Sequence, residues 1–151
     1  MKTYDSVEVA KYLRALAFES DYVLNTTQVQ KLLYILYGYY LSTYNHKIIN
    51  EDPQAWPFGP VFPRTREAIN YQKINKLENI SNDLQNDSLL TEILRKIVEN
   101  YGDFPATKLS AWSHSQGGAW DKSVKKWGFK WGHIISDKLI KDYFSELKVF
   151  D

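Results

Sequence analysis

The hydrophobic residues of this chain recur mainly at the three- and four-residue intervals of amphipathic helices. A polar capping pattern at Asp5 predicts a first helix that ends near Phe18. A second capping pattern, formed by Thr27 and Gln30, predicts a longer helix that ends near Tyr44. Because this longer helix carries apolar residues on two sides, we expect it to lie at the centre of the domain.

The same periodicity predicts further helices over residues 64–71, 88–101 and 106–114, and a last one from residue 136 onward. The helix over residues 88–101 has one apolar face. Its opposite face places two oppositely charged pairs at i,i+4 spacing, Glu92 with Lys96 and Arg95 with Glu99.

Three segments interrupt the helical pattern. Residues 52–63 contain four of the five prolines together with large apolar side chains, so we expect an ordered, packed loop that is neither helix nor central strand. Residues 72–87 are rich in Asn and Gln, which favours a flexible connection. Residues 127–132 predict a turn or a short hairpin. The sequence therefore predicts one compact, mainly α domain over residues 1–151, with about six helices around a central apolar helix and a minor two-stranded β-ribbon.

The composition is that of a soluble globular protein, with 44% hydrophobic and 25% charged residues. A net charge of +1 argues against a nucleic-acid or membrane-surface binder. The chain has no cysteine, which excludes disulfides and fits a reducing cytoplasm. The longest apolar run, residues 32–41, is shorter than the ~20 residues of a spanning helix, and the charged N-terminus does not read as a signal peptide.

No arrangement of residues predicts a catalytic site, a cofactor or a metal ion. The histidines His46, His114 and His133 lack the spacing of a ligand motif, and the glycines form no phosphate-binding loop. Ser113 precedes His114, but adjacent residues on a helix point about 100° apart and rarely touch through their side chains. We therefore interpret His114 as a histidine that hydrogen-bonds at a helix end.

An enzyme remains a weaker hypothesis. Only Glu67 and Asp121 lie in a sequence context apolar enough to raise the pKa of a carboxyl group. His114 with Asp121 would be the acid–base pair of such an enzyme.

Basic and aromatic residues alternate in the segment that contains Lys126, Trp127, Phe129 and Trp131. Such rings can stack on single-stranded nucleic acid, can anchor a protein interface, or can simply pack at the end of a solvated helix. Because the overall charge is nearly neutral, we favour a protein interface over nucleic acid and expect these four residues to bind a partner protein.

Three segments carry a resemblance to a known family. Residues 30–41 read QKLLYILYGYYL, residues 55–61 read AWPFGPV, and residues 109–120 contain a Ser-His pair followed by a tryptophan. In this order they resemble the motifs of the Panacea or SocA-like antitoxin domain, a family also found among phage-associated proteins. Ser113 stands where the family pattern has threonine, and Ala119 stands where it has proline.

The resemblance implies a small helical domain without a cofactor that binds and neutralises a small toxin protein, often encoded by an adjacent gene. We interpret the motif residues mainly as structural, because their residue types suit close helix packing, a packed turn and a helix end. These residues are Gln30, Lys31, Tyr34, Gly38, Trp56, Gly59, Pro60, His114 and Trp120. Partner specificity would then lie on variable surfaces such as residues 127–131 and the connection over residues 72–87. The alternatives are a nucleic-acid-binding regulator, although no helix-turn-helix pattern is present, and a phage accessory or adaptor protein.

Overall fold

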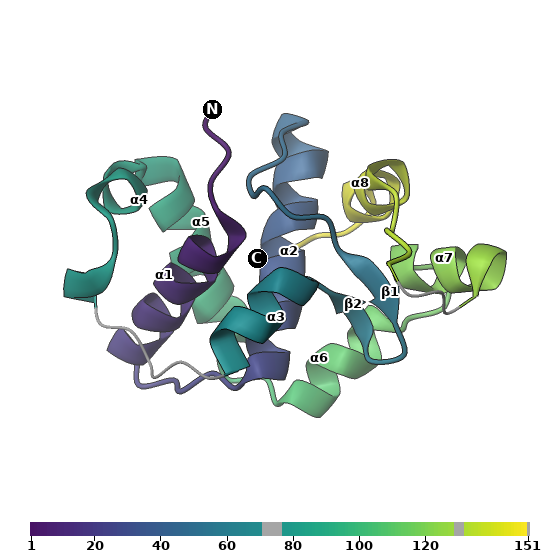
Figure 1. Ribbon diagram of the computed structural model, residues 1–151, viewed down its shortest axis with the longest axis horizontal. Coiled ribbons are helices and arrows are strands. Elements are labelled where there is room, and N and C mark those ends of the chain that lie inside the picture. The colour runs from purple at the N-terminus through teal and green to yellow at the C-terminus, as the bar shows by residue number, and fades with distance from the viewer. Residues whose placement is uncertain (71–76, 129–131, 151) are drawn as a thin grey trace.

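The computed structural model describes residues 1–70, 77–128 and 132–150, and it shows the mainly α domain that the sequence predicts (Figure 1). The helices are α1 (Ser6–Glu19), α2 (Thr26–Tyr44), α3 (Pro63–Asn70), α4 (Asn82–Asn86), α5 (Ser88–Tyr101), α6 (Ala106–Ser113), α7 (Ala119–Trp127) and α8 (Asp137–Ser145). A short 3-10 helix, η1 (Leu77–Asn79), precedes α4. The strands β1 (Gln54–Trp56) and β2 (Gly59–Val61) pair as one antiparallel hairpin.

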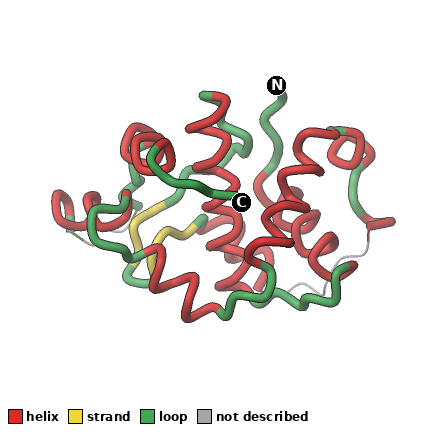
Figure 2. The backbone as a smooth tube through the Cα atoms, turned by 180° about the vertical axis from the view of Figure 1, so that it is seen from behind, coloured by secondary structure: helices red, strands yellow, loops and turns green. Residues whose placement is uncertain are grey.

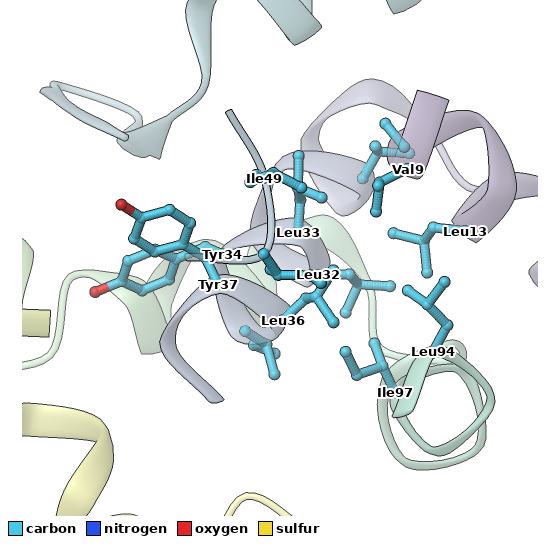
Figure 3. Close-up of a cluster of buried hydrophobic side chains, with 14 of the residues drawn as sticks. Val9, Leu13, Leu32, Leu33, Tyr34, Leu36, Tyr37, Ile49, Leu94 and Ile97 are labelled. Atoms are coloured by element: carbon cyan, nitrogen blue, oxygen red, sulfur yellow. The ribbon is translucent and has the colours of Figure 1, made fainter. Parts of the chain in front are cut away.

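The central position predicted for α2 is confirmed. In Figure 1, α1, α4 and α5 lie on one side of α2, and the hairpin, α6, α7 and α8 lie on the other. Figure 3 shows how α2 divides its side chains between these halves. Leu32, Leu33 and Leu36 face residues of α1 and α5, whereas Tyr34 and Tyr37 point to the opposite side. All five side chains are fully buried, so α2 is the element on which both halves of the fold assemble.

The predicted helix boundaries are close to those observed, but the capping residues of α2 and α5 differ from those expected. Helix α1 begins after Asp5, whose carboxylate caps it as predicted. Helix α2 is capped by Asn25 and not by Thr27. The side chains of Asn25 and Gln28 each accept a hydrogen bond of 2.8 Å from the main-chain N–H of the other residue. Gln30, which we expected in the capping box, is buried and makes a tertiary contact described below.

Residues 77–87 were expected to belong to a flexible connection, but they form η1 and α4. Ile80 and Leu84 are buried, and these apolar contacts anchor a segment whose composition is otherwise polar. Asp87, and not Ser88, caps α5 by accepting a hydrogen bond of 3.0 Å from the Leu90 N–H. The first residues of the expected connection lie outside the described part of the chain.

One of the two ion pairs predicted along α5 is observed. Glu92 and Lys96 lie 3.5 Å apart, but Arg95 lies 3.7 Å from Glu19 of α1 instead of pairing with Glu99. Because α1 packs beside α5, it supplies an acid that helical spacing alone does not reveal.

Residues 52–63 contain the β-hairpin, which their proline content led us not to expect. Ala55 in β1 pairs with Pro60 in β2, and the Ala55 N–H donates to the carbonyl oxygen of His133 at 3.1 Å on the other side of β1. Pro60 therefore lies in an outer strand, where its missing N–H removes no bond from the middle of the sheet. The minor ribbon that the sequence predicts is confirmed, and it lies in this segment.

Helix α8 is tied to α2. Ser136, at the predicted start of the last helix, caps α8, and the hydroxyl of Tyr37 in α2 donates to Asp137 at 2.5 Å. After α8 the chain returns towards the middle of the molecule (Figures 1 and 2). There the carbonyl oxygen of Val149 accepts a hydrogen bond from the Tyr101 hydroxyl of α5. The C-terminal segment thus connects the two halves of the fold.

Candidate partner-binding site

Residues of the three family-like motifs meet in one region, where α2, the hairpin and α6 contact one another (Figure 1). Helix α2 contributes Gln30 and Lys31, the hairpin contributes Gly59 and Pro60, and His114 follows the last turn of α6. Each of these residues contacts a different part of the region.

The side chain of Gln30 binds the main chain at the end of the hairpin. Its Oε1 accepts a hydrogen bond of 2.7 Å from the Phe62 N–H, and its Nε2 donates to the Phe62 carbonyl oxygen at 3.3 Å. The amide therefore pairs with both main-chain polar groups of Phe62, whose carbonyl oxygen also accepts a hydrogen bond of 2.9 Å from the Arg66 N–H. Gln30 itself is 3% exposed.

Lys31 is a buried lysine with a main-chain partner. Its side chain is 1% exposed, and its Nζ donates to the carbonyl oxygen of Pro60 at 3.0 Å. Burial lowers the pKa of the Lys31 ammonium group to about 8, because the charged form loses its water. Among the described residues, no acidic side chain forms an ion pair with Lys31.

The hairpin approaches α6 through Gly59. This residue has a φ of +97°, which favours glycine, and a Cβ atom there would lie 2.6 Å from the Ser113 Oγ. It would also lie 3.3 Å from the Lys31 side chain and 3.3 Å from the His114 ring. The absence of a side chain at this position therefore allows the close contact between α2, the hairpin and α6.

His114 joins α6 to the hairpin turn. Its Nδ1 lies 2.5 Å from the Ser110 carbonyl oxygen, and its Nε2 lies 3.0 Å from the Pro57 carbonyl oxygen. Its ring packs edge-on against Trp120 at 4.2 Å, and the Trp120 indole N–H donates to the Trp56 carbonyl oxygen at 2.7 Å. These contacts link the second and third motifs to each other.

The same geometry argues against a nucleophile–base pair. The Ser113 hydroxyl donates to the Ser110 carbonyl oxygen at 2.8 Å, and both ring nitrogens of His114 face carbonyl oxygens. Asp121 also departs from our expectation. A hydrogen bond from the Gly117 N–H, together with Lys125, lowers the pKa of its carboxyl group, whereas the sequence context suggested a raised pKa.

A cavity of about 440 Å³ opens beside these residues, between the start of α2, the hairpin turn and the end of α6. Its lining combines apolar residues (Pro57, Val61 and the exposed Phe58 ring) with polar and charged side chains, among them Thr26, Thr27, Lys31, Arg66 and His114. The described lining residues include no aspartate or glutamate.

Sequence reasoning missed two residues of this cavity. Phe58 was expected to pack in the loop, but it is 62% exposed at the turn of the hairpin. Arg66 had no distinguishing pattern, and only the fold brings its guanidinium to 5.5 Å from the Trp56 ring. Two further motif residues, Tyr34 and Gly38, lie away from the cavity, in the packing between α2 and α8.

The surface expected to bind a partner is described in part. Trp127 at the end of α7 is 46% exposed, and the Lys126 ammonium lies 5.0 Å from the centre of its ring. Ile134, also 47% exposed, follows His133, whose ring lies 5.4 Å from that of Trp127. The other two predicted residues, Phe129 and Trp131, lie outside the described residues.

In the ranges that the structure covers, no three His, Asp or Glu side chains come together as a metal site would require. Over the same ranges, no helix has the length and apolar character needed to cross a membrane.

The chain is a mainly α domain in which residues of the three motifs meet beside one cavity. Residues 29–121 match the family described as Antitoxin SocA-like, Panacea domain, and the match covers more than half of the chain. The chain belongs to this family. It is also 29% identical to Antitoxin SocA of Caulobacter vibrioides (strain NA1000 / CB15N), over 98% of this chain and 86% of that protein. No solved structure matches the chain.

Proposed function

We propose that this chain is an antitoxin that binds a small toxin protein directly and neutralises it. The observation that carries the proposal is the family membership, together with a likeness to Antitoxin SocA that extends over 98% of the chain. We further propose that the protein acts in the cytoplasm without catalysis, and that its partner is encoded by an adjacent gene.

The exposed side chains at one end of the fold support a protein interface. Phe58, Trp127 and Ile134 are all at least 46% exposed, and all belong to the hairpin or to the segments that contact β1. Tryptophan is enriched among the residues that dominate binding energy. We propose that Trp127 and Lys126 anchor the toxin, with Phe129 and Trp131 completing the surface.

The interface need not be large. A specific complex commonly buries about 800 Å² on each partner, and two or three aromatic anchors account for most of its affinity. The hairpin and the end of α7 together offer exposed aromatic and basic side chains of this kind.

A growth assay tests the proposal. The neighbouring small open reading frame is expressed alone and then together with this chain, and the two proteins are purified through a tag on one of them. Growth arrest that co-expression relieves, with both proteins in one complex, is the expected result. A toxic neighbour that this chain neither binds nor neutralises would show that the proposal is wrong.

A further inference from the structure

The cavity beside Lys31 is lined by cationic side chains that no acidic side chain balances in the described part of the chain. Lys31 is 1% exposed, and its ammonium group has three donors, one of which binds the Pro60 carbonyl oxygen. Neither Lys31 nor Arg66 takes part in any ion pair among the described residues. A buried lysine without a counter-ion is costly, because burial penalises its charged form.

The positions of the other lining groups favour an anion at the same place. Arg66 is half-buried over Trp56, which holds its guanidinium on one side of the cavity. Thr26 and Thr27 lie in the first turn of α2, where main-chain N–H groups have no partner within the helix and the helix dipole is positive. Two cationic side chains, a helix start and hydroxyl groups thus line the same cavity.

We infer that this cavity receives the carboxylate side chain of an aspartate or glutamate on the partner protein, which pairs with Lys31 and Arg66. The inference rests on the proposed function, since it assumes that a protein partner binds this chain. A side-chain carboxylate fits the cavity because it brings a negative charge on a short stem and leaves the partner's main chain outside. Phe58, exposed at the edge of the cavity, would contact apolar residues that flank the acid.

The inference has a consequence for Lys31 itself. Burial lowers the pKa of Lys31, because its charged form loses water. A partner carboxylate at hydrogen-bonding distance would favour the charged form and raise this pKa when the complex forms. A purely structural role for Lys31 predicts no such change.

The first experiment needs no toxin. Amide NMR spectra of the ¹⁵N-labelled chain are recorded with N-acetyl-glutamate N-methylamide, which carries only a side-chain carboxylate, and with the matching glutamine compound. We expect saturable shifts at Thr26, Thr27 and His114 with the acid alone, and their loss in Lys31→Met. Absence of a charge-dependent shift would overturn the inference.

Two further compounds distinguish other anions. N-acetyl-alanine carries only a main-chain carboxylate, and inorganic phosphate represents a nucleic-acid backbone. If either one shifts these signals and the glutamate compound does not, the cavity has a different ligand and the inference is wrong.

The second experiment uses the toxin complex. We expect Arg66→Gln and Lys31→Met to weaken binding at least tenfold, and Arg95→Gln, a half-exposed arginine on α5, to leave it unchanged. The pKa of Lys31, followed through its side-chain NMR signals, should rise by at least one unit in the wild-type complex. Arg66→Gln keeps the test valid if Lys31→Met fails to fold.

The outcomes separate the two proposals. Wild-type binding that neither variant weakens, or an unchanged pKa of Lys31 in the complex, would overturn the carboxylate site and leave the antitoxin proposal standing. A wild-type chain that binds no neighbouring toxin would contradict the proposed function, and the first experiment would still decide whether the cavity takes a carboxylate.

Discussion

Gly38 of α2 faces the ring of Phe144 in α8, and a Cβ atom at Gly38 would lie 2.2 Å from the Cδ2 and Cε2 atoms of that ring. Phe144 is 2% exposed and packs edge-on against Tyr34 at 5.4 Å and Trp112 at 6.1 Å. Since these rings surround it, Phe144 cannot move aside without disturbing its neighbours. The missing side chain at Gly38 therefore decides how closely α8 approaches α2.

We predict that Gly38→Ala lowers the free energy of unfolding by about 1–3 kcal/mol, because the added methyl group overpacks this contact. Urea denaturation measures the change. The double variant Gly38→Ala/Phe144→Leu should lose less free energy of unfolding than the sum of the two single losses. The leucine at position 144 is smaller than phenylalanine and leaves room for the added methyl group. Thr43→Ala, at an exposed position of the same helix, is the control. A Gly38→Ala variant as stable as the control would contradict the packing argument.

Tyr37 should contribute to stability through its hydroxyl. It donates to Asp137 at 2.5 Å and lies 3.3 Å from Asp52, and burial together with these carboxylates raises the pKa of Tyr37 above its usual value. We expect Tyr37→Phe to lower the free energy of unfolding by about 1.5–3 kcal/mol, the usual contribution of a hydrogen bond to a charged group. A double-mutant cycle with Asp137→Asn should give a coupling energy well above zero, and additive effects would refute the bond.

The Gln30 amide should protect one main-chain group from exchange with solvent. In Gln30→Leu, the Phe62 N–H loses its acceptor, so its hydrogen exchange should become faster and the protein less stable by about 1–3 kcal/mol. Exchange followed by NMR provides the measurement. Gln116→Leu, an exposed glutamine, should leave the Phe62 amide unchanged. Equal protection in both variants would show that Gln30 is dispensable.

Stability should depend on pH through Lys31. The pKa of Lys31 is about 8 in the folded chain, and its ordinary value of 10.5 applies to the unfolded chain. Between pH 8 and pH 10.5 the unfolded chain therefore holds a proton that the folded chain has released. Raising the pH therefore favours the folded state, by up to about 1–3 kcal/mol. Above pH 10 the trend should reverse, because burial raises the pKa of Tyr34 and Tyr40, and the unfolded chain loses those protons first.

Denaturation curves at a series of pH values measure this dependence. Lys31→Met removes the titrating group, so its free energy of unfolding should lack the rise between pH 8 and pH 10 and should keep the fall above pH 10. A rise of the same size in Lys31→Met would assign the effect to other groups.

Trp127 should matter for binding and not for folding. We expect Trp127→Ala to weaken toxin binding at least about tenfold while the melting temperature stays nearly constant. Phe18→Ala is a matched control, because Phe18 is also 46% exposed but lies on α1, in the other half of the fold. If Trp127→Ala abolishes the thermal transition, the ring belongs to the core and the proposed interface is wrong.

The sequence by itself determined the class of fold, the approximate bounds of the long helices and the central place of α2. These features depend on local preferences, namely helical periodicity, capping residues such as Asp5 and Ser136, and the two apolar sides of α2. The motifs of residues 30–41, 55–61 and 109–120 also indicated the family. Local rules failed where a distant residue decides the outcome, as when Arg95 pairs with Glu19 and not with its helical neighbour Glu99.

Only the tertiary structure decided what the motif residues do together. It placed Gln30 against Phe62, Lys31 against Pro60, and His114 between the end of α6 and the hairpin turn. It also showed that a proline-rich segment forms a hairpin, because β1 gains partners on both sides. Contacts between residues far apart in the chain depend on how the helices pack, and neither periodicity nor composition carries that information.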